Sequence, residues 1–151
     1  MNQLLGEYQC RIDEKGRLRL PSALLKQLGD SDSYDLVVNR GVDNCVNLYP
    51  KAVWDKISKK VNKLNTYVKK NRDFIRYFYR GATELTTDSS ERILLPKELV
   101  KYADIDRDVV LFAYNDRVEV WSATKYDSLL GDDGDIYSDL AEEVMGSLND
   151  E

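Results

Sequence analysis

Residues 13 to 26 read Asp13-Glu14-Lys15-Gly16-Arg17-Leu18-Arg19-Leu20-Pro21-Ser22-Ala23-Leu24-Leu25-Lys26, and the pattern returns 75 positions later (88 − 13). The second copy is Asp88-Ser89-Ser90-Glu91-Arg92-Ile93-Leu94-Leu95-Pro96-Lys97-Glu98-Leu99-Val100-Lys101. Asp, Arg, Leu, Pro, Leu and Lys recur unchanged, and two further positions exchange one aliphatic residue for another. Similarity of this length and order indicates that one structural unit occurs twice.

Each copy predicts a unit of the form β-β-α-β-β. A first strand is expected at residues 7–12 and at 82–87, followed by the Asp-led turn. A second short strand then ends at Pro21 or Pro96, because proline stops ladder pairing and suits the first turn of a helix. The leucine spacing after each proline predicts that helix, and Gly29 is expected to cap the first one.

A hairpin completes each unit. The first is predicted between residues 36–38 and 46–48, and the second between 109–113 and 118–120. Asn115-Asp116 stands at the second turn, and both residue types tolerate left-handed dihedral angles.

The fold class expected is α+β, with two tandem β-β-α-β-β units that complete one another as an intrachain pseudo-dimer. A unit of about 50 residues buries too little apolar surface to be stable alone. We expect a first unit at residues 3–50, a basic helical connector at 51–80, a second unit at 81–122 and a helical acidic tail at 123–151.

The connector and the tail carry opposite charges. Apolar residues at intervals of three and four predict amphipathic helix in two pieces between residues 51 and 80, which hold ten Lys and Arg against two Asp. These cations form either a solvated helix face or a phosphate-facing surface. Residues 131–151 hold eight acidic residues and no basic one. Leucine and valine at four-residue spacing predict a weakly docked or fraying helix there.

Several absences argue against an enzyme. The chain has no histidine and two cysteines, Cys10 and Cys45, which are expected to be reduced and packed in strands. None of the common nucleotide-binding glycine motifs occurs. We therefore expect no catalytic residues, no metal, no cofactor and no small-molecule substrate.

The first Asp-led turn concentrates positive charge. Lys15, Arg17 and Arg19 lie within seven residues, with Arg11 just before them, and arginine suits bidentate contact with guanine. Gly16 permits a positive φ and close backbone approach. Asp13, like Asp88 in the second copy, is interpreted mainly as a bracket that fixes the turn.

These features together resemble the MraZ family of bacterial transcriptional regulators. The resemblance covers about residues 3 to 130 and rests on three motifs. They are the paired Asp-x-x-x-Arg turns, Val-x-Leu-Tyr-Pro-x-x-x-Trp at residues 46–54, and Arg76-Tyr77-Phe78-Tyr79-Arg80-Gly81-Ala82-Thr83-Glu84.

The resemblance implies an AbrB-type swapped-hairpin barrel and a closed ring of many copies. It also implies binding to short G-rich repeats in double-stranded promoter DNA of the division and cell-wall gene cluster. The family's motif residues correspond to Asp13, Lys15, Arg17, Asp88 and Arg92. The second copy departs from the usual pattern, since Ser90 stands where the first copy has Lys15, and Glu91 where it has Gly16.

The charge distribution favours the same function. The net charge of −5 comes from a basic half, residues 1–80 with 16 Lys and Arg against 9 Asp and Glu, and an acidic half, residues 81–151 with 6 against 18. DNA is expected on the basic half. The DNA-binding residues predicted are Arg11, Lys15, Arg17, Arg19 and Arg92.

Other functions remain open at this point. An antitoxin-like module could bind a partner protein through the acidic tail, and a purely structural ring would not bind DNA at all. The longest apolar run has six residues, far fewer than the roughly 20 of a membrane helix, and no signal peptide is evident. A cytoplasmic, nucleoid-associated protein is therefore expected.

Overall fold

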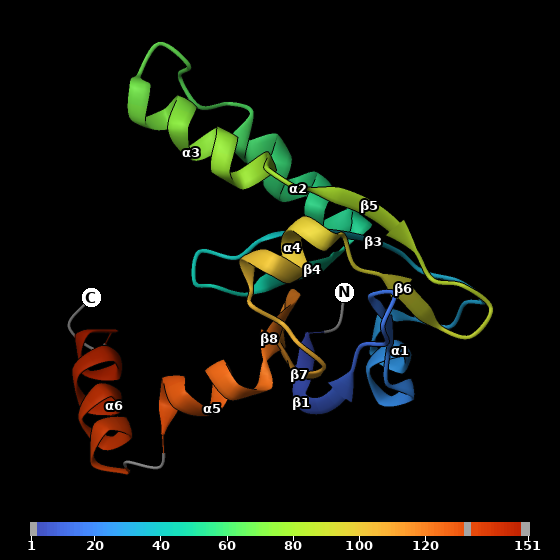
Figure 1. Cartoon of the computed structure of the whole chain (residues 1–151). Coiled ribbons are helices and arrows are strands. Elements are labelled where there is room, and N and C mark those ends of the chain that lie inside the picture. The colour runs from blue at the N-terminus through green and yellow to red at the C-terminus, as the bar shows by residue number, and fades with distance from the viewer. Residues whose placement is uncertain (1–2, 132–133, 149–151) are drawn as a thin grey trace.

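The computed structural model describes residues 3–131 and 134–148. Each repeat forms the predicted unit (Figure 1). The first copy contains β1 (Leu4–Arg11), β2 (Arg17–Arg19), α1 (Ser22–Leu28), β3 (Asp35–Arg40) and β4 (Val46–Pro50). The second contains β5 (Thr83–Thr86), β6 (Arg92–Leu94), α4 (Lys97–Tyr102), β7 (Asp108–Asn115) and β8 (Arg117–Ser122).

Sequence signals account for most of these boundaries. Both small helices begin directly after a proline, and Gly29 ends α1 with φ of 120°. Asn115 has φ of 54° at the turn between β7 and β8, as predicted. The strand β1 starts at Leu4, earlier than predicted, because its partner β7 continues far enough for Leu4 to pair with Asn115.

The two copies exchange their first strands. The order of the main sheet is β1-β7-β8-β4-β3-β5, so β1 of the first copy pairs with β7 of the second, and β5 of the second pairs with β3 of the first. The strands β4 and β8 join the two hairpins at the centre. This exchange confirms the swapped-hairpin pseudo-dimer.

The sheets do not close into a barrel within the described residues. The six-stranded sheet ends at two edges, β1 and β5, while β2 and β6 form a separate two-stranded ribbon. A single bridge, Ile12 to Leu18, links the end of β1 to that ribbon. The expected barrel is therefore an open sheet with a ribbon across it, because three-residue strands are too short to continue the main ladder.

One hydrophobic core is shared by both copies. The leucines Leu18, Leu20 and Leu24 pack in one cluster with their counterparts Ile93, Leu95 and Leu99, and none of the six is more than 1% exposed. Strand exchange makes this sharing obligatory, because each hairpin is completed by a strand of the other copy. Each copy therefore depends on the other for one strand of its half of the sheet.

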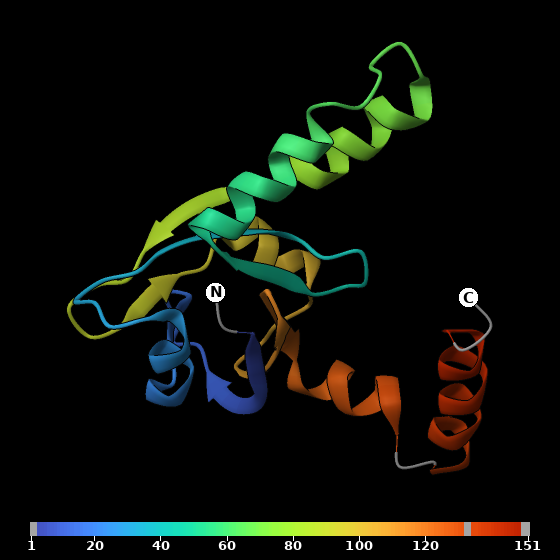
Figure 2. The ribbon, with the colours of Figure 1, turned by 180° about the vertical axis from the view of Figure 1, so that it is seen from behind.

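The connector forms two antiparallel helices that project from the sheet, α2 (Lys51–Val61) and α3 (Lys69–Tyr79), as the periodicity predicts (Figures 1 and 2). In this α2–α3 arm, Trp54 of α2 stacks on Phe78 of α3, with 4.9 Å between ring centroids, and Trp54 also packs with Val37 and Tyr49 of the sheet. The helix α3 itself buries no residue.

The tail forms α5 (Ala123–Leu130) and α6 (Gly134–Leu148), neither of which buries a residue (Figure 1). Asp132, Asp133, Asp150 and Glu151 of the predicted acidic tail lie outside the described residues. No helix in residues 3–131 or 134–148 combines the length and the apolar character that a membrane crossing needs.

The turn at Gly16 generates a prediction about stability. Gly16 has φ of +87°, and a Cβ there would lie 3.3 Å from the backbone oxygen of Leu95. We expect Gly16→Ala to lower the free energy of unfolding by about 1–2 kcal/mol, measured by urea denaturation.

Gly146→Ala is the matched control, because a Cβ at that position in α6 would meet nothing within 4 Å. Alanine is also the better helix former, so this control should not be less stable than the wild type. Equal losses in both variants would contradict the role given to the Gly16 conformation.

Candidate nucleic-acid interface

The first Asp-led turn is held by one carboxylate. An oxygen of Asp13 accepts the backbone N–H groups of Lys15 and Arg17, at 3.0 and 2.9 Å. The backbone N–H of Gly16 donates to the carbonyl oxygen of Asp13 at 3.0 Å. These bonds fix the path of the chain where Lys15 projects, so the lysine stands on a rigid turn.

The same carboxylate orients Arg17. Its second oxygen accepts the Nε–H of Arg17 at 2.6 Å, and the two side chains are 39% and 35% exposed. Within the described part of the chain, the terminal amino groups of this guanidinium have no protein partner. Arg17 is thereby held in one direction with the donors at its tip still available.

The second turn repeats this geometry despite its different sequence. Asp88 accepts the backbone N–H groups of Ser90 and Arg92 at 2.9 Å each, and the Nε–H of Arg92 at 2.9 Å. Glu91, which replaces the glycine, adopts φ of 63°, a conformation that costs a residue with a side chain about 1–2 kcal/mol. The guanidinium of Arg92 is thus placed like that of Arg17, with its side chain 34% exposed.

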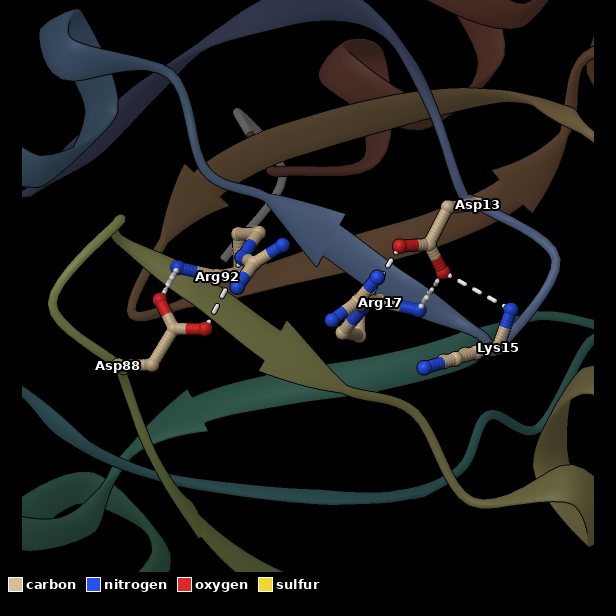
Figure 3. Close-up of polar contacts among 5 residues, drawn as sticks. All are labelled: Asp13, Lys15, Arg17, Asp88 and Arg92. Atoms are coloured by element: carbon tan, nitrogen blue, oxygen red, sulfur yellow. Dashed lines mark hydrogen bonds and ion pairs between the residues drawn. The ribbon is translucent and has the colours of Figure 1, made fainter.

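The β2–β6 ribbon brings together the two Asp–Arg brackets, Asp13 with Arg17 and Asp88 with Arg92. Its antiparallel register pairs Arg17 with Leu94, Leu18 with Ile93, and Arg19 with Arg92. Leu18 and Ile93 face the core, so Arg17, Arg19, Arg92 and Leu94 share the outer face, where the arginines of both brackets are seen between the two aspartates (Figure 3). The sequence predicted these arginines one by one, but it did not predict that they lie side by side.

Arg11 lies apart from the ribbon. It ends β1 in the main sheet, where its Nε is 2.9 Å from a carboxylate oxygen of Asp108. Both side chains are largely exposed, so the pair contributes little to stability. The pseudo-symmetric position shows a similar contact, since the Thr86 hydroxyl donates to Asp35 at 2.8 Å.

Further cations gather beside the first turn. A cleft of about 430 Å³ is bordered there by Lys15 together with Lys97, Lys101 and Arg107 from the second copy, and by the acidic residues Asp13, Glu14 and Asp106. Sequence reasoning missed the three cations of the second copy, because only strand exchange brings α4 against the turn of the first copy.

The second turn has a different electrostatic character. The smaller cavity beside it, of about 280 Å³, is lined by Glu91, Asp30 and Lys26 among its charged residues. The ribbon therefore has a cation-rich end at Lys15 and an end near Glu91 without that excess. The backbones of the two turns are related by a pseudo-two-fold axis, but the charged residues around them differ.

The two bracket aspartates have pKa values below the ordinary value near 3.8. For Asp13 the main cause is the backbone hydrogen bond from Arg17, with further contributions from the Arg17 side chain and the Lys15 backbone. For Asp88 the backbone hydrogen bond from Arg92 comes first, followed by that from Ser90. Each interaction favours the charged carboxylate.

The lowered pKa values predict a loss of stability in acid. A carboxyl whose pKa is lower in the folded state stabilises the fold above its unfolded pKa, and this contribution disappears as pH falls through the folded value. We expect the urea concentration at the unfolding midpoint of the wild type to decrease as the pH is lowered below about 4. For the double variant Asp13→Asn/Asp88→Asn this concentration should decrease less steeply, since neither amide titrates.

Asp30→Asn serves as the control, because Asp30 is an exposed residue after α1 and outside both brackets. This variant should keep the pH dependence of the wild type. If the double variant followed the wild-type curve throughout, the acid sensitivity would not come from the brackets.

Comparison with known proteins reveals a family match over both repeats. The family described as "MraZ protein, putative antitoxin-like" matches residues 3–77 and 78–143. A transcriptional regulator MraZ from Flavobacterium psychrophilum is 42% identical, covering 100% of this chain and 97% of the relative. A protein of the same name from Christiangramia forsetii is 45% identical, covering 97% of this chain and 96% of the relative.

Proposed function

The chain belongs to the MraZ family, and on that premise we propose that it is a sequence-specific regulator of transcription that binds double-stranded promoter DNA and has no enzymatic activity. Relatives of full length carry the name transcriptional regulator. The observation that carries the proposal is the outer face of the β2–β6 ribbon, which presents three arginines and one leucine. A cytoplasmic, nucleoid-associated location follows from this function.

The ribbon has the dimensions and chemistry for base recognition. A two-stranded β-ribbon fits the major groove of B-DNA, and an arginine tip can donate two hydrogen bonds to O6 and N7 of guanine. Because Asp13 and Asp88 already occupy the Nε groups, Arg17 and Arg92 meet the bases with their terminal donors in a fixed direction. Arg19 adds a third donor on the same face.

The cations around the first turn suit phosphate binding. One cleft at the end of the ribbon is bordered by Lys15, Lys97, Lys101 and Arg107. In the proposed complex these cations would bind the phosphates that flank the groove. Phosphate contacts supply affinity and register, while base contacts supply specificity. The acidic second half limits indiscriminate binding through the net charge of −5.

Two complementary surfaces support assembly into a ring. The basic α2–α3 arm exposes Tyr67, Phe74 and Tyr77, and beneath it a cavity of about 430 Å³ is lined by Asn39 and Arg117 among others. The helix α6 has four acidic residues, no basic one and a row of exposed apolar side chains: Ile136, Tyr137, Leu140, Val144, Met145 and Leu148.

We therefore place α6 of one copy on the α2–α3 arm of the next. The α2–α3 arm and the α5–α6 tail leave the sheet in different directions (Figures 1 and 2), so this contact joins two different surfaces. Such contacts close into rings when the rotation permits. A ring displays several ribbons at once, and the resulting effective concentration favours tandem G-rich repeats. Promoters of the division and cell-wall genes are the targets that the family resemblance implies.

The exposed apolar row on α6 also favours a second candidate function, capture of a partner protein by the acidic tail. That function predicts that the tail binds another protein. It also predicts that, without this partner, the mass of the protein in solution is the same with an intact and with an altered α6. The two candidates are separated by the assembly experiment below.

Arg17→Ala tests the base-reading ribbon. We expect its affinity for duplexes with tandem guanine-rich repeats to fall by about tenfold or more, since a bidentate guanine contact is worth about 1–3 kcal/mol. Fluorescence anisotropy at fixed moderate salt measures this loss. Wild-type affinity should also fall when 7-deazaguanine, which lacks N7, replaces guanine, whereas Arg17→Ala should respond less.

Lys125→Ala is the matched control, because it removes one cation from α5, away from the ribbon. This variant should bind within about twofold of the wild type, apart from a small electrostatic loss. Undiminished binding by Arg17→Ala would contradict the proposed function.

Val144→Asp tests the ring contact. Val144 is 55% exposed on α6, and a carboxylate in the apolar row should disfavour burial against a second copy. We expect light scattering to show a mass lower than that of the wild type, and anisotropy to show weaker binding to tandem repeats with little change on a single repeat.

Gly146→Asp adds the same charge about 200° away around the helix axis, and its assembly should match the wild type. A wild-type protein that is a monomer would contradict the ring. An unchanged large mass in Val144→Asp would move the contact away from α6.

A further inference from the structure

The outer face of the β2–β6 ribbon holds one residue that cannot read guanine. Its four side chains are Arg17, Arg19, Arg92 and Leu94, arranged as two cross-strand pairs. We infer that Leu94 is a specificity-determining residue that contacts the C5-methyl group of a thymine next to a guanine. This inference rests on the proposed function and adds a second base to the sequence that the ribbon reads.

The position of Leu94 is set by the pleat of β6. Its neighbours Ile93 and Leu95 are each 1% exposed in the shared core, whereas Leu94 itself is 56% exposed. Exposed leucines are common on protein surfaces, so exposure alone indicates nothing. This leucine, however, stands directly across the ribbon from Arg17, on the face that carries the arginines.

The fold does not require an aliphatic side chain there. The equivalent position in the first copy is Arg19, which occupies the same place on the paired strand and points to the same face. The backbone therefore accepts a cation at this position in one copy and carries a leucine in the other. In the protein without a partner, the side chain of Leu94 leaves apolar surface in contact with water, which is unfavourable. A partner with an apolar group would cover this surface.

The direction of the side chain agrees with a role beside the first turn. The Cδ1 atom of Leu94 lies 3.8 Å from the place that a Cβ on Gly16 would occupy. It thus leans toward the cation-rich end of the ribbon, where Lys15 and the α4 lysines border the cleft. Leu94 and Arg17 are therefore neighbours at the end that we assign to phosphate contact.

Base chemistry selects the ligand of such a pair. In the major groove the four base pairs present hydrogen-bonding groups, and the one apolar group is the thymine methyl. Leucine has no donor or acceptor, so it gains contact energy from that methyl and loses solvation opposite a polar edge. Directly opposed side chains on an antiparallel ribbon lie about 5 Å apart, close enough to meet the same or adjacent base steps.

Replacing thymine by deoxyuridine tests the contact, because it removes the methyl group and keeps the pairing. Duplexes with tandem guanine-rich repeats, each with one thymine changed to deoxyuridine, would be titrated by anisotropy with the full-length wild type, Leu94→Ala and Leu94→Arg. At one thymine beside a guanine, we expect the change to deoxyuridine to weaken wild-type binding about three- to fourfold. This is the loss in affinity that corresponds to one buried methyl group.

Leu94→Ala should bind the thymine and deoxyuridine duplexes equally. Leu94→Arg should bind both more tightly and with a steeper salt dependence, again without discrimination. Leu5→Ala removes another exposed leucine, on β1 in the main sheet, and should keep the wild-type discrimination.

Three outcomes overturn the inference. If the wild type binds the repeats but never distinguishes deoxyuridine from thymine, Leu94 reads no methyl group, and the proposed DNA function stands. If Leu94→Ala keeps the discrimination, another residue makes the contact. If the wild type binds none of the duplexes, both this inference and the proposed function fail.

Discussion

Exchange of the first strands between the two repeats dictates how the ribbon and the core are arranged. Because β1 completes the hairpin of the second copy and β5 that of the first, the short strands β2 and β6 are drawn against each other over one core. Leu18 and Ile93 anchor that pairing from below. This pairing places the arginines above them on a common face.

The two Asp–Arg brackets have the same hydrogen-bonding geometry although the residues between Asp and Arg differ in the two turns. In both copies one carboxylate accepts two backbone N–H groups and one guanidinium Nε–H, although Gly16 in one copy corresponds to Glu91 in the other. Three hydrogen bonds hold Glu91 in a conformation that glycine would adopt at less cost. What differs between the ends is charge, so the backbone repeat is a pseudo-dimer whose two ends are electrostatically distinct.

The α2–α3 arm and the helix α6 concern a separate feature, the proposed assembly of several copies. In the function that we propose, a three-residue ribbon would make few contacts with DNA, and a protein with net charge −5 would gain little from long-range attraction. Linking many ribbons compensates for weak single contacts. In the proposed ring, the α2–α3 arm would supply positive charge and exposed aromatic side chains, and α6 would supply negative charge and exposed apolar side chains.

The duplicated β-β-α-β-β unit could be predicted from sequence, because proline positions, turn residues and hydrophobic periodicity are local signals that act within a few residues. The cluster of cations at the first turn makes Arg17 and Arg19 candidate DNA contacts without knowledge of the fold, whereas Arg92 became a candidate through the family resemblance. Sequence patterns did not predict that these arginines share one ribbon face with Leu94, or that Lys97, Lys101 and Arg107 border the first turn. Those neighbours lie about 75 or more positions away in the chain, and only pairing between the two copies, driven by burial of the common core, brings them into contact.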